Sequence, residues 1–258
     1  MQRTNPDRVA LRFTVLVLVA ITAVSGFFVV ADILLPEWFV IVGRWLPALI
    51  SLVVIRELNG GVAKWWDLCP GGWRRLLAGG AVGVVVLLGV YVAAAVVVAL
   101  TGIGVMQPWS TLAPVAIMVI PMVLLFSLST LGEEAAWRGF LQQTLAGLGF
   151  WRASSVVAAV WVLFHIPLHG AMAVQGTIPV TVAVVTTLGL FPLGLYLSAV
   201  VVRFGSVWPA VFAHALPLST LSLLVNVDGM TTGVHWVVGV VTAALVTAAA
   251  LALAPRGT

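Results

Sequence analysis

The chain reads Leu131-Gly132-Glu133-Glu134-Ala135-Ala136-Trp137-Arg138-Gly139-Phe140 where a long, almost uncharged apolar run that begins at Leu112 comes to its end. This stretch places two carboxylates and one guanidinium within six residues. An ionisable group held inside a bilayer costs roughly 2.5–3.5 kcal/mol on insertion scales, so three such groups together need partners or a function. One explanation is a helix end at the membrane surface, where lipid headgroups solvate the charges. The other is a functional site inside a membrane domain.

Helical spacing assigns the two glutamates different roles. If the apolar run continues as a helix, Glu134 and Arg138 stand four residues apart on one face, in the favourable order for an ion pair. Glu133 then points about 100° away, over Ala136 and Trp137. The pair would neutralise Glu134 and leave Glu133 as a lone carboxyl in apolar, tryptophan-lined surroundings, which suits a general base.

The composition excludes a soluble protein. Hydrophobic residues make up 62% of the chain and charged residues only 8%, which predicts an all-α polytopic membrane protein. We expect a single integral membrane domain over residues 1–258, surrounded by the lipid bilayer of the cell membrane. The basic residues are scattered between apolar runs, which argues against a nucleic-acid surface. The single cysteine, Cys69, excludes an internal disulfide framework. The sequence leaves the oligomeric state open.

The apolar runs predict a bundle of about eight transmembrane helices. They cover 13–35, 38–55, 76–100, 112–130, 152–168, 179–202, 207–225 and 234–254, and the fourth continues into the glutamate stretch. The first run is also compatible with a cleavable signal peptide, but its length past Ser25 favours an uncleaved helix. Every second connection holds no Lys or Arg, which predicts that these connections are outside and that both termini and the connection Arg56–Arg75 are cytoplasmic. Arg44 is expected to pair near Asp32 and Glu37 at a helix end.

Two histidines interrupt later apolar runs, His165 in the fifth and His214 in the seventh. A single histidine in a membrane helix is often structural, but intramembrane ionisable groups normally face the bundle interior and meet each other. With Glu133 they would supply a base, an imidazole that orients water and a second imidazole. The same three side chains would equally suit a divalent metal such as zinc, with one position left for water. His169, which follows Pro167, is expected at a loop edge.

The order of these residues resembles that in the CPBP intramembrane proteases, which include type II CAAX prenyl proteases and bacteriocin-processing or self-immunity proteins. That family carries Glu-Glu-x-x-x-Arg, then Phe-x-x-x-His, then His-x-x-x-Asn on successive membrane helices. The stretch Glu133–Arg138 matches the first motif, and Trp161 with His165 matches the second with Trp in place of Phe. His214 begins the third motif, but the fourth residue after it, where the family has Asn, is Leu218. The resemblance covers roughly residues 112–226.

The resemblance implies an intramembrane endopeptidase that hydrolyses a membrane-associated peptide or protein. Glu133 and His165 would activate the attacking water, and His214 would help to hold the oxyanion. Glu134 and Arg138, with Trp161, would support the site. The three catalytic side chains and Leu218 are then expected around one cavity open to the cytoplasmic side. Because Leu218 replaces an oxyanion-assisting Asn, the alternative is a catalytically weak or inactive relative that acts as a binding, immunity or scaffold factor.

Overall fold

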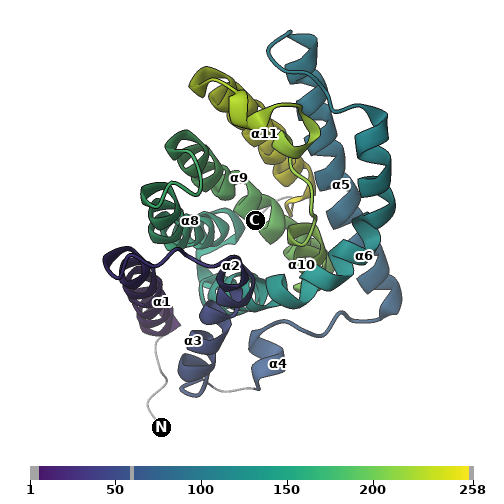
Figure 1. The fold of residues 1–258 in the computed structure, drawn as a ribbon. Helices are drawn as coiled ribbons and strands as arrows, with labels where there is room; N and C mark the ends of the chain where they lie inside the picture. The colour runs from purple at the N-terminus through teal and green to yellow at the C-terminus, as the bar shows by residue number, and fades with distance from the viewer. Residues whose placement is uncertain (1–5, 59–60, 256–258) are drawn as a thin grey trace.

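A computed structural model describes residues 6–58 and 61–255, and helices without any strand make up the regular structure of these residues (Figure 1). Within this part of the chain, seven helical segments are long and apolar enough to cross a membrane. The protein is therefore a multi-pass integral membrane protein. The seven segments are α1 (Pro6–Val30), α2 to α3 (Glu37–Ile55), α5 (Trp73–Leu100), α6 to α7 (Trp109–Thr144), α8 (Phe150–Val174), α9 (Val180–Phe204) and α11 (Thr232–Leu253).

Two of these segments change their helical geometry on the way. The second consists of α2 (Glu37–Val42), a 3-10 turn η1 (Gly43–Trp45) and α3 (Leu46–Ile55). In the fourth, α6 (Trp109–Glu134) continues as a π-helix η2 (Ala135–Leu141) and then as α7 (Gln142–Thr144). The remaining short elements are α4 (Val62–Trp65), α10 (Trp208–His214) and the 3-10 turns η3 (Ala146–Leu148), η4 (Leu221–Leu223) and η5 (Val227–Gly229).

The expected seventh helix over 207–225 is wrong, because α10 ends at His214. Pro217 explains the early end, since proline disfavours a helical residue before it and clashes with the carbonyl four residues back. Non-helical backbone at membrane depth must find partners inside the protein. Val225 N accordingly donates to Val105 O at 2.9 Å, and Gln107 N donates to Leu223 O at 2.9 Å.

This irregular segment nevertheless carries the chain across the bundle. Near their starts, α9 and α11 approach through Thr181 and Thr232, whose hydroxyl oxygens lie 3.3 Å apart. Near their ends, Ala199 and Ala254 belong to one apolar cluster. The two helices are therefore parallel, and the residues between them must return to the end of the bundle where α9 began. Residues 6–58 and 61–255 thus cross the bundle eight times, seven times as a long helical segment.

The described ends of the chain lie at the same end of the bundle. Arg12 near the start of α1 forms an ion pair with Glu57, just beyond α3. Past the other end of α1, Leu35 N donates to Gln175 Oε1 at 3.0 Å, just beyond α8. Since the start of α8 packs beside the end of α11 through Phe150, α1 begins where α11 ends. Which side of the membrane this end faces remains a prediction.

Cys69 gives a direct test of that orientation. It is exposed in the connection between α4 and α5, whose basic residues predict a cytoplasmic position. We expect a membrane-impermeant thiol reagent to spare Cys69 in intact cells and to label it in inside-out vesicles. A Cys69→Ser protein controls for labelling elsewhere. Ready labelling of intact cells would show that the predicted topology is inverted.

Candidate active site

Both glutamates are buried where α6 passes into the π-helix η2: Glu133 is 1% exposed and Glu134 0% exposed. π-helical turns are rare and occur frequently at functional sites. The predicted ion pair is present, because Arg138 Nη1 lies 3.1 Å from Glu134 Oε1 and both side chains are fully buried. This excludes the alternative in which lipid headgroups solvate these charges.

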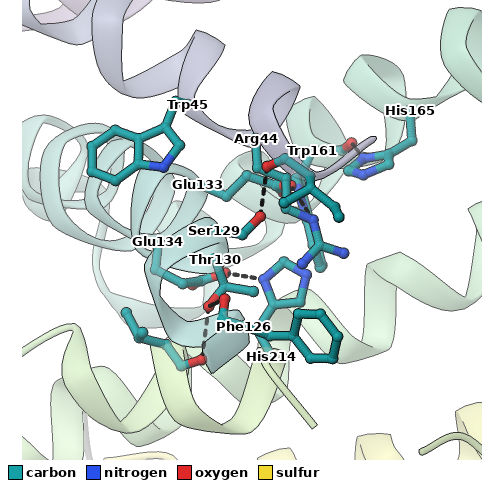
Figure 2. A network of polar contacts seen from close by, with 12 residues as sticks. Arg44, Trp45, Phe126, Ser129, Thr130, Glu133, Glu134, Trp161, His165 and His214 are labelled. Atoms are coloured by element: carbon teal, nitrogen blue, oxygen red, sulfur yellow. Dashed lines mark hydrogen bonds and ion pairs between the residues drawn. The ribbon is translucent and has the colours of Figure 1, made fainter. Parts of the chain in front are cut away.

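Glu133 is not a lone carboxyl. Trp161 Nε1 donates to its Oε2 at 2.5 Å, and Arg44 Nε lies 3.6 Å from its Oε1 (Figure 2). The expected pairing of Arg44 near Asp32 and Glu37 is therefore wrong. The expected neighbour Trp137 also lies elsewhere, because it packs its ring edge-on against Phe13 at 5.5 Å.

The η1 turn that carries Arg44 is docked tightly onto α6. Ser129 Oγ donates to Ile41 O at 2.6 Å, and Trp45 Nε1 donates to Leu128 O at 3.0 Å. Between these contacts, a Cβ atom added to Gly132 would lie 2.7 Å from Arg44 O and 2.8 Å from Trp45 Cα. The glycine thus allows the backbone approach that brings Arg44 to Glu133.

Gly132→Ala tests this docking. The added methyl group meets backbone atoms that cannot rotate away, so η1 must move off α6 and take Arg44 with it. We expect a loss of about 1–3 kcal/mol in the free energy of unfolding, as for other overpacked interiors. Gly89→Ala in α5 is the matched control, because nothing lies within 4 Å of the added Cβ. Equal unfolding midpoints for the two variants in detergent would contradict the docking.

Trp161 lies at the centre of the ionisable groups. The centroid of its ring is 5.4 Å from that of His165 and 5.2 Å from that of His214, with both imidazoles edge-on. The guanidinium carbon of Arg138 lies 4.3 Å from the ring centroid, a cation–π distance. Trp161 therefore joins α8 to the charged residues of α6 and η2, and its indole N–H offers Glu133 a hydrogen bond that a phenylalanine lacks.

His214 contacts the second glutamate rather than the first. Its Nδ1 lies 2.7 Å from Glu134 Oε1, the oxygen that also pairs with Arg138 (Figure 2). The short helix α10 is held against α6 by Thr130 Oγ1, which donates to Val211 O at 3.0 Å. Because α10 ends at His214, Leu218 is not on the same helical face. It packs instead in apolar clusters with residues such as Val119.

A cavity of about 290 Å³ lies beside Glu133 and is also lined by Arg44, His165 and His169. It extends to Met172 and Ile178, where α8 ends and α9 approaches its start. This is the end of the bundle opposite to the exposed Cys69. The expected cavity, shared by all three predicted catalytic residues and open to the predicted cytoplasmic side, is therefore wrong. Glu133 and His165 share this cavity, whereas His214 and Leu218 are not among the residues that line it.

His169 is not at a loop edge, because α8 continues through Pro167 to Val174. Its Nδ1 lies 2.7 Å from Thr187 Oγ1 on α9, which ties the two helices together beside the cavity. The sequence reasoning missed both His169 and Arg44. The four-residue spacing from His165 was the available signal for His169, whereas no local signal pointed to Arg44.

The three side chains named as possible metal ligands have different hydrogen-bond partners in this structure. Within residues 6–58 and 61–255, no three His, Cys, Asp or Glu side chains are arranged to hold a metal ion. Nδ1 of His214 faces Glu134 instead of Glu133, and Nδ1 of His165 faces Trp161 O at 2.8 Å. A carbonyl oxygen only accepts hydrogen bonds, so His165 donates through Nδ1 and keeps Nε2 for the cavity.

Comparison with known proteins gives one family match. Residues 114–217 match the model of a family described as type II CAAX prenyl endopeptidase Rce1-like. No curated protein sequence matches the chain significantly. The matched region begins in α6 and ends just after α10, so it contains Glu133, Glu134, His165 and His214. Arg44 lies outside it.

Proposed function

The match over residues 114–217 supports membership of the CPBP family of intramembrane proteases, and from this premise we propose that the protein is an intramembrane endopeptidase. Its substrate would be a membrane-associated peptide or protein whose scissile bond enters the cavity beside Glu133. The single observation that carries the proposal is the position of a buried carboxylate and an imidazole on the same cavity. This pair is suited to hold and activate one water molecule.

In the proposed reaction, the water lies between a carboxylate oxygen of Glu133 and Nε2 of His165. Glu133 takes one proton from the water while the water oxygen bonds to the carbonyl carbon of the scissile amide. The π electrons of the carbonyl move onto its oxygen and form the oxyanion. When the C–N bond breaks, the proton on Glu133 passes to the leaving nitrogen, which gives a carboxylic acid and an amine.

The hydrogen bonds around the pair support these roles. Trp161 Nε1 holds one oxygen of Glu133 and fixes the direction of the carboxylate. The bond from His165 Nδ1 to a backbone carbonyl leaves Nε2 as an acceptor, so it can orient the second O–H of the water. Glu134, Arg138 and His214 form a second cluster of polar side chains, of which Arg138 and His214 also contact Trp161.

A catalytically weak or inactive relative is the second candidate function. The observation that favours it is the position of Leu218, which packs among apolar residues and supplies no hydrogen-bond donor. A protein of this kind would use the same cavity to bind a peptide segment as an immunity or scaffold factor.

Cleavage by the purified protein distinguishes the two candidates. We would incubate it in detergent and in lipid nanodiscs with two fluorescent probes, a farnesylated CAAX peptide and an unprenylated transmembrane peptide. Mass spectrometry would identify a product in which one amide bond has gained one water. Cleavage in the presence of a metal chelator supports the proposed side-chain mechanism, whereas loss of cleavage restored by zinc favours the metal alternative. Tight binding of a probe without turnover favours the second candidate.

A further inference from the structure

Arg44 lines the cavity although it lies outside the region, residues 114–217, that matches the family. Its side chain extends from η1 toward Glu133, and in Figure 2 the guanidinium lies among Glu133, His165 and His214. The side chain is 30% exposed. Among the described residues, its one ion pair is the 3.6 Å contact from Nε to Glu133 Oε1. Its two terminal nitrogens form no ion pair with a described residue, and the side chain lines the cavity.

The proposed reaction needs a donor at this place. Oxyanion formation concentrates a full negative charge on the former carbonyl oxygen, and each pre-oriented donor to that oxygen commonly contributes 10²–10³ in rate. Leu218 cannot donate and faces apolar clusters. His214 does not line the cavity, and its Nδ1 is taken by Glu134. Neither residue that the sequence offered for the oxyanion is among those that line the cavity beside Glu133.

We propose that Arg44 is a catalytic residue of this protein and donates hydrogen bonds to the oxyanion, a role that rests on the proposed function. The attacked carbonyl must lie within one water of Glu133, so its oxygen enters the space that the terminal nitrogens of Arg44 face. A guanidinium is planar, always charged and able to hold one oxygen with two N–H groups.

The movement of charge favours this arrangement. Before the attack, the negative charge beside Arg44 is on Glu133. As Glu133 takes the proton from water, it becomes neutral, and the negative charge appears on the carbonyl oxygen. The guanidinium therefore keeps an anionic partner throughout the step. Its interaction with substrate strengthens only as the charge develops, which is the condition for faster turnover rather than tighter substrate binding.

Arg44→Met and Arg44→Lys test the proposal with the two probes described above. We expect Arg44→Met to lower kcat by roughly 10²–10³-fold with little change in KM, because a donor used only in the transition state is lost. Arg44→Lys keeps a charged donor without the fork and should retain more activity than Arg44→Met. Arg12→Met is the control, because it breaks another Arg–Glu pair, exposed and remote from the cavity. It should leave kcat unchanged.

The pH dependence of kcat separates this role from a positioning role. If Arg44 acted only by keeping Glu133 ionised, Arg44→Met would move the pH–rate profile and reach the wild-type plateau at another pH. The proposal is overturned if Arg44→Met reaches the plateau rate of the wild type at any pH, or if its kcat is unchanged. In either case, cleavage by the wild type leaves the proposed function standing. If Arg44→Met fails to fold, Arg44→Gln takes its place, and a kcat of Arg44→Gln equal to that of the wild type would overturn the proposal. Cleavage of neither probe by the wild type would overturn the proposed function and this inference together.

Discussion

Replacing Glu133 with glutamine is expected to lower the rate of peptide cleavage by about 10²–10⁴-fold, the usual contribution of a general base. The amide has almost the same shape and can still accept the hydrogen bond from Trp161 Nε1. It cannot take a proton from water. Arg44 loses its partner, but its side chain is partly exposed to the cavity, where water can solvate it. The fold should therefore survive the change.

The measurement compares initial cleavage rates with unfolding midpoints in the same detergent. Glu37→Gln is the matched control, because it removes an exposed carboxylate at the start of α2. Turnover by Glu133→Gln within a few-fold of the wild type would show that another group activates the water. A large fall in the unfolding midpoint would instead give Glu133 a structural role.

Local spacing predicted the parts of the site that depend on one helix. The apolar runs predicted the membrane helices, and the four-residue spacing predicted the buried pair of Glu134 and Arg138. A π-helix did not disturb this pair, because the two residues remain one turn apart at its start. The same spacing separated Glu133 from this pair, and Glu133 is the glutamate that lines the cavity.

Contacts between distant segments were not predictable in this way. Arg44 reaches Glu133 because Gly132 lets the backbone of η1 approach α6, and no periodicity in either segment encodes that approach. The position of Leu218 was predicted wrongly because the helix was extended past Pro217, a residue whose effect on the helix was available from the sequence. Had α10 been ended before Pro217, the separation of Leu218 from the cavity would have followed.

The two glutamates should differ most clearly in stability. Glu134→Gln is expected to lower the free energy of unfolding by about 3–5 kcal/mol, the usual cost of removing one partner from a buried ion pair. Glu134 Oε1 is shared by Arg138 Nη1 and His214 Nδ1, so the change leaves a buried guanidinium without its anion. Two nitrogens of Arg138, Nε and Nη2, already lack hydrogen-bond partners among the described residues. The cation–π contact with the face of the Trp161 ring would then be the remaining close interaction of the Arg138 guanidinium.

The double variant Glu134→Gln, Arg138→Met separates charge imbalance from lost packing. If the cost of Glu134→Gln comes from the unpaired guanidinium, removal of that charge should restore part of the stability, and the double-mutant cycle should show a favourable coupling of the original pair. Chemical unfolding in detergent, followed by circular dichroism, measures all four proteins of the cycle. Additive losses would mean that Glu134 and Arg138 act independently. Equal destabilisation by Glu134→Gln and Glu133→Gln would contradict the division of roles, because only Glu134 pairs with the fully buried guanidinium of Arg138.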